Sequence, residues 1–308
     1  MTSRRLGFAL TVGGAVLFST KAIFVKLAYF YPVSSIALLG LRMGFSLPAF
    51  LLVGYLRRER RAGEEPLTGK TVALVAGLGL MGYYGASYTD FLGLRYLTAG
   101  MERIVLFVYP TLVLLIQRAL FGTRITRVQA FATAVCYAGL VVAFGAADLR
   151  AGSDFLVGAA LVFASALLYA GFVIGNGRLT PRFGSVRFTS IAMTAAACGV
   201  LAHGLLAGER FVGLAPAVYA YGATIALVCT VVPSYMLAEG IRRIGASDAA
   251  IVGAVGPLVT IGLEYVVLGE TLTWGQGVGG ALVVAGVLAV ARTRQGASRR
   301  SAPRRSPR

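Results

Sequence analysis

The stretch that decides the fold runs from Ser87 to Gly139 and reads SYTDFLGLRYLTAGMERIVLFVYPTLVLLIQRALFGTRITRVQAFATAVCYAG. A second stretch, Ser234 to Gly286, reads SYMLAEGIRRIGASDAAIVGAVGPLVTIGLEYVVLGETLTWGQGVGGALVVAG. The two align without a gap at an offset of 147 residues, with matches such as Ser87 on Ser234, Gly93 on Gly240, Pro110 on Pro257, Gly122 on Gly269 and Gln129 on Gln276. A fixed offset over such a length indicates a duplicated unit.

The composition is that of a membrane protein. Of the 308 residues, 57% are hydrophobic and only 13% are charged, and the mean hydropathy is +0.78. A soluble domain carries about 25% charged residues. Ten apolar runs are long enough to cross a bilayer: 6–27, 33–55, 70–93, 98–119, 125–145, 155–177, 185–207, 214–237, 248–268 and 275–291. The sequence therefore predicts an all-α integral membrane protein with ten transmembrane helices.

The net charge of +17 is distributed as in a multispan protein and not as in a nucleic-acid-binding one. When the loops are assigned alternately to the two sides of the membrane, 22 Lys and Arg residues fall on one side and four on the other. The positive-inside rule then places both termini in the cytoplasm and the protein in the plasma membrane. We expect a lipid bilayer as partner and no nucleic acid.

Each half of the chain holds five predicted spans, which is an odd number. Two copies in tandem must therefore enter the membrane with opposite orientations. We expect a first five-helix repeat over 1–147, an inverted second repeat over 148–291, and a disordered, Arg-rich cytoplasmic tail over 292–308. Inverted repeats are the usual architecture of secondary transporters, in which rocking of one half on the other exposes a central site alternately to each side.

Two prolines mark the expected centre of such a site. Pro110 and Pro257 are matched in the two repeats, and both lie near the middle of a predicted span. A proline inside a helix frees the carbonyl four residues earlier, and in a membrane that carbonyl must face protein or a water-lined cavity. We interpret both prolines as helix breaks that allow gating; a plain packing kink is the alternative.

Charges inside the spans supply candidate substrate-binding residues, because a charge at mid-helix costs about 2.5–3.5 kcal/mol on insertion scales. The candidates are Lys21, Arg42, Glu102 and Glu264. Structural ion pairs between spans are the alternative, and Glu102 could also complement the dipole at the start of its helix. Because both signs of charge are present, the pattern suits a substrate that bears a carboxylate, or a carboxylate that takes up protons during transport.

Tyrosines within the spans complete the candidate substrate-binding set: Tyr84, Tyr88, Tyr109 and Tyr235. Tyr88 and Tyr235 are matched residues of the two repeats. Each of these rings could line a cavity or anchor its helix at a membrane interface.

The sequence contains little that an enzyme could use. His203 is the single histidine, and the three cysteines, Cys136, Cys198 and Cys229, match no metal site or disulfide framework. None of the common phosphate-loop, metalloprotease or nucleophile-elbow motifs is present. We expect no enzymatic activity, no cofactor and no metal.

Several stretches carry a family resemblance. FSTKAIFVKLAY (18–29), ALLGLRMGFSLP around Arg42, YTDFLGLRYLTAGMERIVLFVYPTLV (88–113) and GPLVTIGLEYVVLGETLT (256–273) resemble the EamA-type family of the drug/metabolite transporter superfamily. The resemblance covers nearly the whole chain. It implies a carrier of the cytoplasmic membrane, usually an exporter of amino acids, metabolites or drugs, with a cavity built from spans 1, 3, 4, 6, 8 and 9.

The leading hypothesis is a gradient-driven secondary transporter that exports a small molecule and acts as a monomer or homodimer. A passive facilitator or channel is the alternative, although no span shows the continuous polar stripe that an open pore needs. A membrane-bound enzyme or scaffold is a further alternative.

Overall fold

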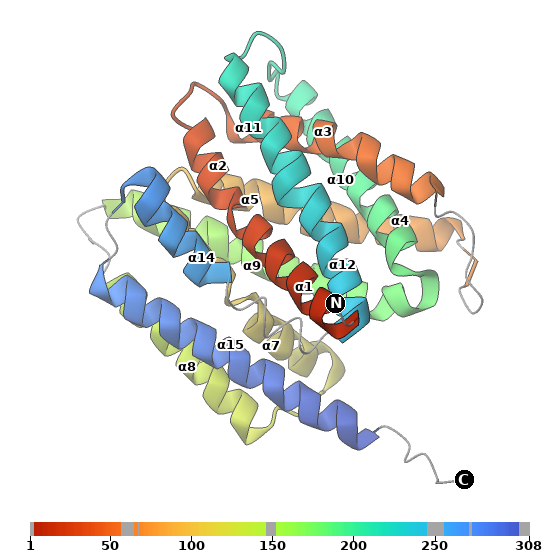
Figure 1. The fold of residues 1–308 in the computed structure, drawn as a ribbon, viewed down its shortest axis with the longest axis vertical. Coiled ribbons are helices and arrows are strands. Elements are labelled where there is room, and N and C mark those ends of the chain that lie inside the picture. The colour runs from red at the N-terminus through yellow and green to blue at the C-terminus, as the bar shows by residue number, and fades with distance from the viewer. Residues whose placement is uncertain are drawn as a thin grey trace.

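The computed structural model describes residues 3–56, 65–66, 68–145, 152–244, 256–270 and 273–301. Within these residues the regular secondary structure is helical, with no strand. Most helices run along one common direction, from upper left to lower right in the view of Figure 1. The described part of the chain is thus an all-helical bundle.

The described part of the first half contains nine helical elements, one of which is a π-helical segment labelled η1. They are α1 (Ser3–Ser19), α2 (Lys21–Ala28), α3 (Ser35–Leu56), α4 (Gly69–Gly79), η1 (Leu80–Gly85), α5 (Ala86–Gly93), α6 (Ala99–Leu106), α7 (Tyr109–Phe121) and α8 (Arg127–Gly145).

The described part of the second half contains two π-helical segments, η3 and η4. Its elements are α9 (Gly152–Phe183), α10 (Ser185–Leu206), α11 (Pro216–Ala226), η3 (Leu227–Val231), α12 (Val232–Ile244), α14 (Gly256–Leu263), η4 (Glu264–Leu268) and α15 (Trp274–Ser301).

The helices have the length and composition of membrane spans. Six runs in the described residues are long and apolar enough to cross a bilayer: Arg5–Ala28, Ser35–Leu56, Ala99–Phe121, Ser153–Thr180, Val186–Leu206 and Pro216–Leu237. Three shorter apolar helices are Arg127–Ala143, Gly256–Leu268 and Trp274–Ala289. The α4–η1–α5 run covers the predicted span 70–93, and the start of the predicted span 248–268 lies outside the described residues.

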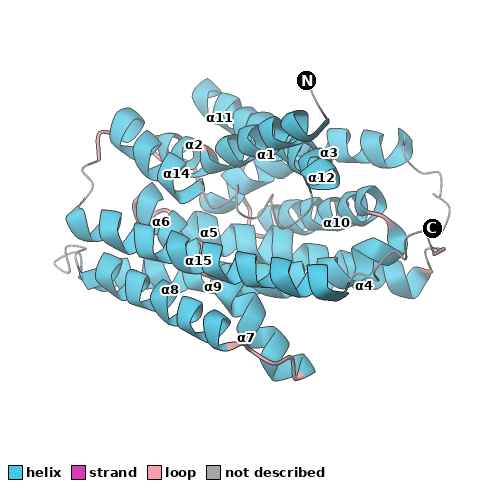
Figure 2. Ribbon diagram, turned by 60° about the horizontal axis from the view of Figure 1, so that its bottom comes forward, coloured by secondary structure: helices cyan, strands magenta, loops and turns pink. Residues whose placement is uncertain are grey.

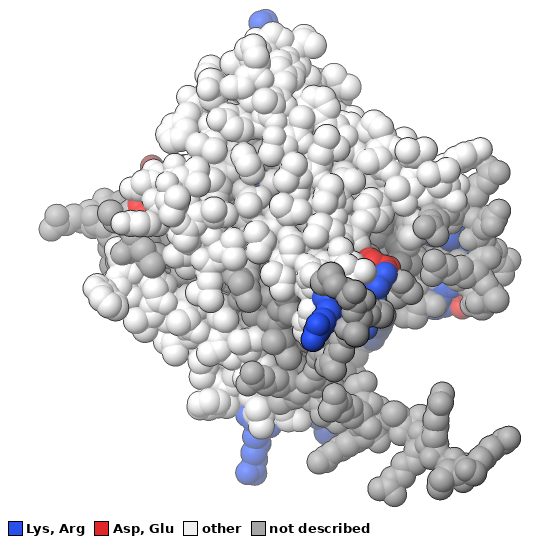
Figure 3. Space-filling model, viewed as in Figure 1, with Lys and Arg blue, Asp and Glu red and all other residues white. Residues whose placement is uncertain are grey.

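The surface agrees with a position in lipid. Large apolar side chains are widely exposed, among them Leu52, Phe131, Val141 and Val266. On the face drawn in Figure 3, the visible charged side chains are few and lie at the edges or near the start of α1, while the broad centre is uncharged. A soluble protein rarely exposes so large a contiguous apolar surface. The chain is a multi-pass membrane protein.

The same local features recur in the two halves at the offset of 147 residues. The π-helical segments η1 and η3 begin at matched residues, Leu80 and Leu227. The matched Gly122 and Gly269 both end their helices with a left-handed backbone, with φ of 64° and 68°, a conformation that glycine adopts at little cost.

A reciprocal capping box also begins both α8 and α15. The backbone N–H of Thr126 donates to the Gln129 side chain at 2.9 Å, and the Gln129 N–H donates to Thr126 Oγ1 at 3.2 Å. In α15, Thr273 and Gln276 exchange the same two hydrogen bonds at 3.1 and 3.3 Å. The duplicated sequence therefore produces duplicated local structure.

Helices of one half pack extensively on helices of the other. The largest such contacts join α8 with α15, α1 with α12, α3 with α10, and α5 with α9; Figure 2 shows α8 and α15 along each other at one margin of the bundle. Matched glycines allow two of these contacts. A Cβ on Gly93 would lie 2.5 Å from Val162 of α9, and one on Gly240 would lie 2.2 Å from Thr11 of α1.

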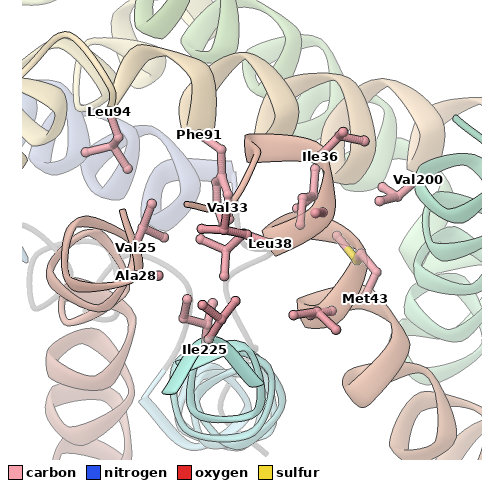
Figure 4. Close-up of a cluster of buried hydrophobic side chains, with 14 of the residues drawn as sticks. Val25, Ala28, Val33, Ile36, Leu38, Met43, Phe91, Leu94, Val200 and Ile225 are labelled. Atoms are coloured by element: carbon pink, nitrogen blue, oxygen red, sulfur yellow. The ribbon is translucent and has the colours of Figure 1, made fainter. Parts of the chain in front are cut away.

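A large apolar core joins α2, α3, α5, α10 and α11. Figure 4 shows Val25, Leu38, Phe91 and Ile225, from four different helices, directed toward one another. All four side chains are almost completely buried. This core fixes α2, α3 and α5 relative to one another, and these are the helices that carry Lys21, Arg42 and Asp90.

The predicted disordered tail over 292–308 requires a correction. α15 continues as a helix to Ser301, so the first part of that segment is helical, and residues 302–308 lie outside the described residues. Alanine and arginine favour helix, and the first proline after the predicted span is Pro303. Charge alone therefore does not end the helix at the membrane boundary.

Candidate functional site

A cavity of about 280 Å³ lies between the two halves. Its polar and charged wall residues are Ser19, Lys21, Arg42, Ser87, Asp90, Arg103 and Ser165. Its aromatic wall residues are Phe18, Tyr83, Phe107, Tyr109 and Tyr169. The cavity is large enough for a small metabolite, and its wall combines an apolar surface with a few charged groups, as ligand sites commonly do.

Breaks in the helices bring the charged residues to this wall. α1 ends at Ser19 and α2 starts at Lys21, which places the lysine at the junction between the two helices. α6 begins at Ala99, where the Thr98 hydroxyl accepts a hydrogen bond from the Met101 N–H at 3.2 Å. Glu102 lies in the first turn of α6, beside Asp90 near the C-terminal end of α5.

Lys21, Asp90, Glu102 and Arg103 form a buried ionic cluster. The Lys21 ammonium donates a hydrogen bond to Asp90 Oδ2, and its Nζ lies 3.7 Å from Glu102 Oε1. Arg103 Nε lies 3.7 Å from Glu102 Oε2. Asp90 is 2% exposed and Glu102 is 0% exposed. Two cations thus stabilise two buried acids. Glu102 lies 3.7 Å from each cation and makes no hydrogen bond with either.

Several buried atoms of this cluster have no hydrogen-bond partner within the protein. In the described part of the chain they are Asp90 Oδ1, both carboxylate oxygens of Glu102, and Nε and Nη2 of Arg103. A buried polar group without a partner is costly, by about 1–3 kcal/mol or more when it is charged. Because the Asp90 and Glu102 carboxyl groups interact with each other, the two Arg103 donors are the atoms with unused capacity to bind a polar ligand.

Arg42 joins the two halves across the cavity. Its Nε donates to Thr230 Oγ1 of η3 at 3.0 Å, and its Nη1 donates to Ser87 Oγ of α5 at 3.0 Å. The Thr230 hydroxyl in turn donates to the carbonyl of Ile225 at 2.8 Å, a group that the π-helical turn exposes. The guanidinium carbon lies 5.8 Å from the centre of the Phe91 ring. Neutral hydroxyls thus position this charge without neutralising it.

Glu264 makes a separate contact between the halves. Its Oε2 accepts a hydrogen bond from the Gly100 N–H at 2.8 Å, and the residue is 5% exposed. Gly100 lies in the first turn of α6, where N–H groups carry partial positive charge. Glu264 does not reach the cavity wall.

The predicted tyrosines separate into two groups. Tyr109 lies on the cavity wall, with its ring centre 5.0 Å from that of Tyr169. Tyr84 and Tyr88 instead contact His203: the Tyr84 hydroxyl lies 2.9 Å from His203 Nδ1, and the Tyr88 ring centre lies 5.0 Å from the imidazole. Tyr235 packs beside Phe50, with ring centres 6.1 Å apart.

The two candidate prolines lie in first turns of helices. α6 ends at Leu106 and α7 begins at Tyr109, so Pro110 follows a break in the fourth predicted span. Leu106, whose carbonyl a proline at position 110 would free, lines the cavity. Pro257 lies in the first turn of α14, and the segment before it lies outside the described residues.

Several wall residues were not among the sequence-based candidates for substrate binding, among them Tyr83, Asp90, Arg103 and Tyr169. A signal existed for two of them, because Asp90 and Arg103 are charged residues at the ends of apolar runs. Tyr83 and Tyr169 carry no sequence signal that distinguishes them from the other tyrosines of the spans.

The described residues contain no group of three or more His, Cys, Asp or Glu side chains placed to hold a metal ion.

Comparisons with known proteins agree with this architecture. The model of the EamA-like transporter family matches residues 5–145 and again 156–292. "Uncharacterized transporter YcbK" of Bacillus subtilis (strain 168) is 30% identical over 265 residues, which cover 84% of each chain. A crystal structure with 17% identity has a TM-score of 0.66, covering 97% of this chain and 100% of the other, which supports the fold alone. The chain therefore belongs to the EamA-like transporter family, within the drug/metabolite transporter superfamily.

Proposed function

We propose that this protein is a secondary transporter that exports small metabolites, such as amino acids or drug-like compounds, by alternating access. The observation that carries the proposal is the cavity between the two halves, whose wall is interrupted by helix breaks and carries uncompensated polar groups. The driving force would be a gradient of the solute or of protons. The protein would act in the plasma membrane with both termini in the cytoplasm.

The packing of the helices supports an inverted repeat of ten spans. Matched helices of the two halves contact each other, as α3 does with α10 and α8 with α15, and the matched fourth and ninth spans meet through α6 and α14. A two-fold axis in the membrane plane would produce such contacts between mates. The pairs α1–α12 and α5–α9 support the same relation, because each joins the first span of one half to the third span of the other.

In this proposal the solute contacts the cavity wall, and residues beside the wall move as the site opens. Lys21, Arg42, Tyr109 and the adjacent Glu102 would hold the solute, and Pro110 and Pro257 would allow the fourth and ninth spans to bend. We assign Tyr84, Tyr88, Tyr235 and Glu264 to the packed surfaces that rearrange, since they contact neighbouring helices and not the cavity.

Transport in proteoliposomes tests this function. The purified protein would be reconstituted, and the flux of labelled amino acids and small organic acids would be measured with and without an imposed pH gradient. We expect saturable flux of at least one solute above that of empty vesicles. Flux that rises linearly with concentration would indicate a channel, and equal flux in empty vesicles would contradict the proposal.

A further inference from the structure

We propose that Glu102 is a proton-binding site and that its proton releases Arg103 to bind the carboxylate of a small monocarboxylic acid with an apolar or aromatic body. The inference rests on the proposed function, because it takes the cavity to be the solute site. It adds the substrate class, the group that binds it and the accompanying ion.

The edge of the Arg103 guanidinium that has no partner is the edge whose geometry suits a carboxylate. The atoms without partners are Nε and Nη2, the two donors of the planar fork that bind both oxygens of a carboxylate at once. The same chain shows this geometry elsewhere: Nε and Nη2 of Arg182 hold the two oxygens of Glu65 at 2.9 and 2.8 Å. In Arg103 the corresponding donors are buried, and the residue lines the cavity.

Glu102 is the protein group that competes for this fork. Its Oε2 lies 3.7 Å from Arg103 Nε, a distance that a small side-chain movement would close. Its side chain is 0% exposed, no N–H or O–H group of the described residues donates to its oxygens, and its carboxyl group lies beside that of Asp90. A buried carboxylate in this condition either gains a donor or becomes neutral. When Glu102 is neutral, Arg103 is available to bind the solute.

Among the described residues, no second basic group near Glu102 is free to hold it, and Lys26 of α2 lies toward Glu264 and Glu270. Lys21 of α2 already donates to Asp90 of α5. α14 and η4 bring Glu264, which is bonded to the Gly100 N–H. α8 brings the Cys136 thiol, which donates to the Val283 carbonyl of α15. α9 brings Ser165 and Tyr169 to the cavity.

The charge balance makes proton and anion binding mutually favourable. Asp90 offsets Lys21, so protonation of Glu102 leaves Arg42 and Arg103 as the uncompensated charges of the cavity. Arg42 is held by two hydroxyl groups, whereas Arg103 has free donors. By linkage, binding of the proton then increases the affinity for the carboxylate, and binding of the carboxylate increases the affinity for the proton. A carboxylate leaving the cell by this route would take a proton with it.

The cavity size limits the solute. A volume of about 280 Å³ accommodates a small solute of the size of a single-ring acid. Tyr83, Phe107, Tyr109 and Tyr169 line the same space, and they favour a flat apolar body over a second charged group. Benzoate has this size, this body and a single carboxylate, so it is a suitable probe.

The test is calorimetric titration of the purified protein with benzoate at neutral pH, in two buffers that differ in their heat of protonation. We expect wild-type protein to bind benzoate and to take up about one proton for each benzoate bound. Glu102→Gln should still bind benzoate but take up almost no proton. Arg103→Gln should bind benzoate about tenfold to a hundredfold more weakly. Arg118→Gln, which changes an exposed arginine at the end of α7, is the matched control.

Specific results would overturn the proposal. They are failure of wild-type protein to bind benzoate, binding without proton uptake, unchanged proton uptake in Glu102→Gln, or unchanged affinity in Arg103→Gln. Benzamide, which has the same shape without the charge, should bind Arg103→Gln as well as wild type. If Glu102→Gln does not fold, the affinity of wild-type protein for benzoate is measured as a function of pH. It should fall with rising pH, and an affinity that does not change with pH would overturn the proposal.

The two proposals can fail separately. Benzoate binding with proton uptake, in a protein that moves no solute in proteoliposomes, would overturn the proposed function alone. Saturable transport without proton uptake would overturn this inference alone.

Discussion

The two halves of the molecule share local helical structure but differ in their charged residues. Capping boxes, left-handed glycines and π-helical segments recur at matched positions. In the described residues, the buried ion pairs of Lys21, Asp90, Glu102 and Arg103 lie in the first half, whereas the second half holds the buried Glu264, which bonds a backbone N–H. At the offset of 147, Asp90, Glu102 and Arg103 correspond to Leu237, Ala249 and Ala250, and the match of Ile23 with Ile174 places Lys21 on Phe172.

This difference separates residues that build the fold from residues that give the cavity its chemistry. The second half has Leu237 in α12 and Phe172 in α9 at two of those places, and Ala249 and Ala250 lie outside the described residues. The helices therefore do not need the ionic cluster in order to form. Because buried charges cost free energy and the fold does not require them, we attribute them to the solute site.

The largest expected effect comes from removing one member of the ionic cluster. Lys21→Met leaves the buried Asp90 carboxylate without its cation, which should lower the free energy of unfolding by about 3–5 kcal/mol. Unfolding followed in detergent measures the change. The double variant Lys21→Met with Asp90→Leu, which copies the apolar character of the second half, should recover most of the loss. A double variant no more stable than the single one would contradict the comparison.

The next effect concerns transport. Arg42→Met replaces a charge that Thr230 and Ser87 hold across the two halves, while methionine keeps the length and the burial of the side chain. We expect saturable flux in proteoliposomes to fall about tenfold to a hundredfold, with unchanged membrane insertion. Arg118→Gln should transport at the wild-type rate. Wild-type flux in Arg42→Met would remove this residue from the site.

The sequence predicted the features that a local rule determines. Pro110 predicted a break in the fourth span, and the structure has one between α6 and α7. The matched Thr and Gln residues indicated the duplication, and the structure adds the capping boxes that they form. Lys21 and Arg42 were candidates because a charge within an apolar span must face protein or a cavity, and both lie on the wall.

The remaining parts depend on helix register and on contacts between distant helices. A π-helical turn rotates the residues that follow it, so Tyr83 of η1 lies on the cavity while Tyr84 and Tyr88 contact His203. η3 is followed by Pro233, but η1 is followed by the matched Ala86, so no common residue predicts the turn. The pairing of Lys21 with Asp90 similarly depends on how α2 packs beside α5, which local sequence does not reveal.

A smaller effect on stability is expected at Glu264. The residue matched to Glu264 in the first half carries no charge. Glu264→Gln keeps an oxygen for the Gly100 N–H but loses the attraction between a carboxylate and a helix N-terminus. We expect a loss of about 0.3–1 kcal/mol in unfolding free energy. Glu264→Leu leaves that N–H without a partner and should cost about 1–3 kcal/mol. Equal stabilities of the two variants would show that the hydrogen bond contributes nothing.

The smallest effect is expected at the exposed pair of Glu65 and Arg182, which joins the loop before α4 to the end of α9. The hydrogen bond from Arg182 lowers the pKa of Glu65. A carboxyl with a lowered pKa stabilises the fold above its ordinary pKa, and this contribution disappears as pH falls through the lowered value. The small difference in unfolding midpoint between wild type and Glu65→Gln should therefore vanish in acid. A difference that persists or grows in acid would contradict the assignment.

The central claim is that the two halves lie in opposite orientations around one cavity, and thiol labelling in intact cells tests it most directly. Thr126 and Thr273 are exposed, matched residues at the starts of α8 and α15. Each would be changed to cysteine in a protein whose three native cysteines are replaced, and the cells would be treated with a membrane-impermeant maleimide. The inverted arrangement predicts that Thr273→Cys is labelled in intact cells and Thr126→Cys only after permeabilisation. Labelling of both cysteines from the same side would contradict it.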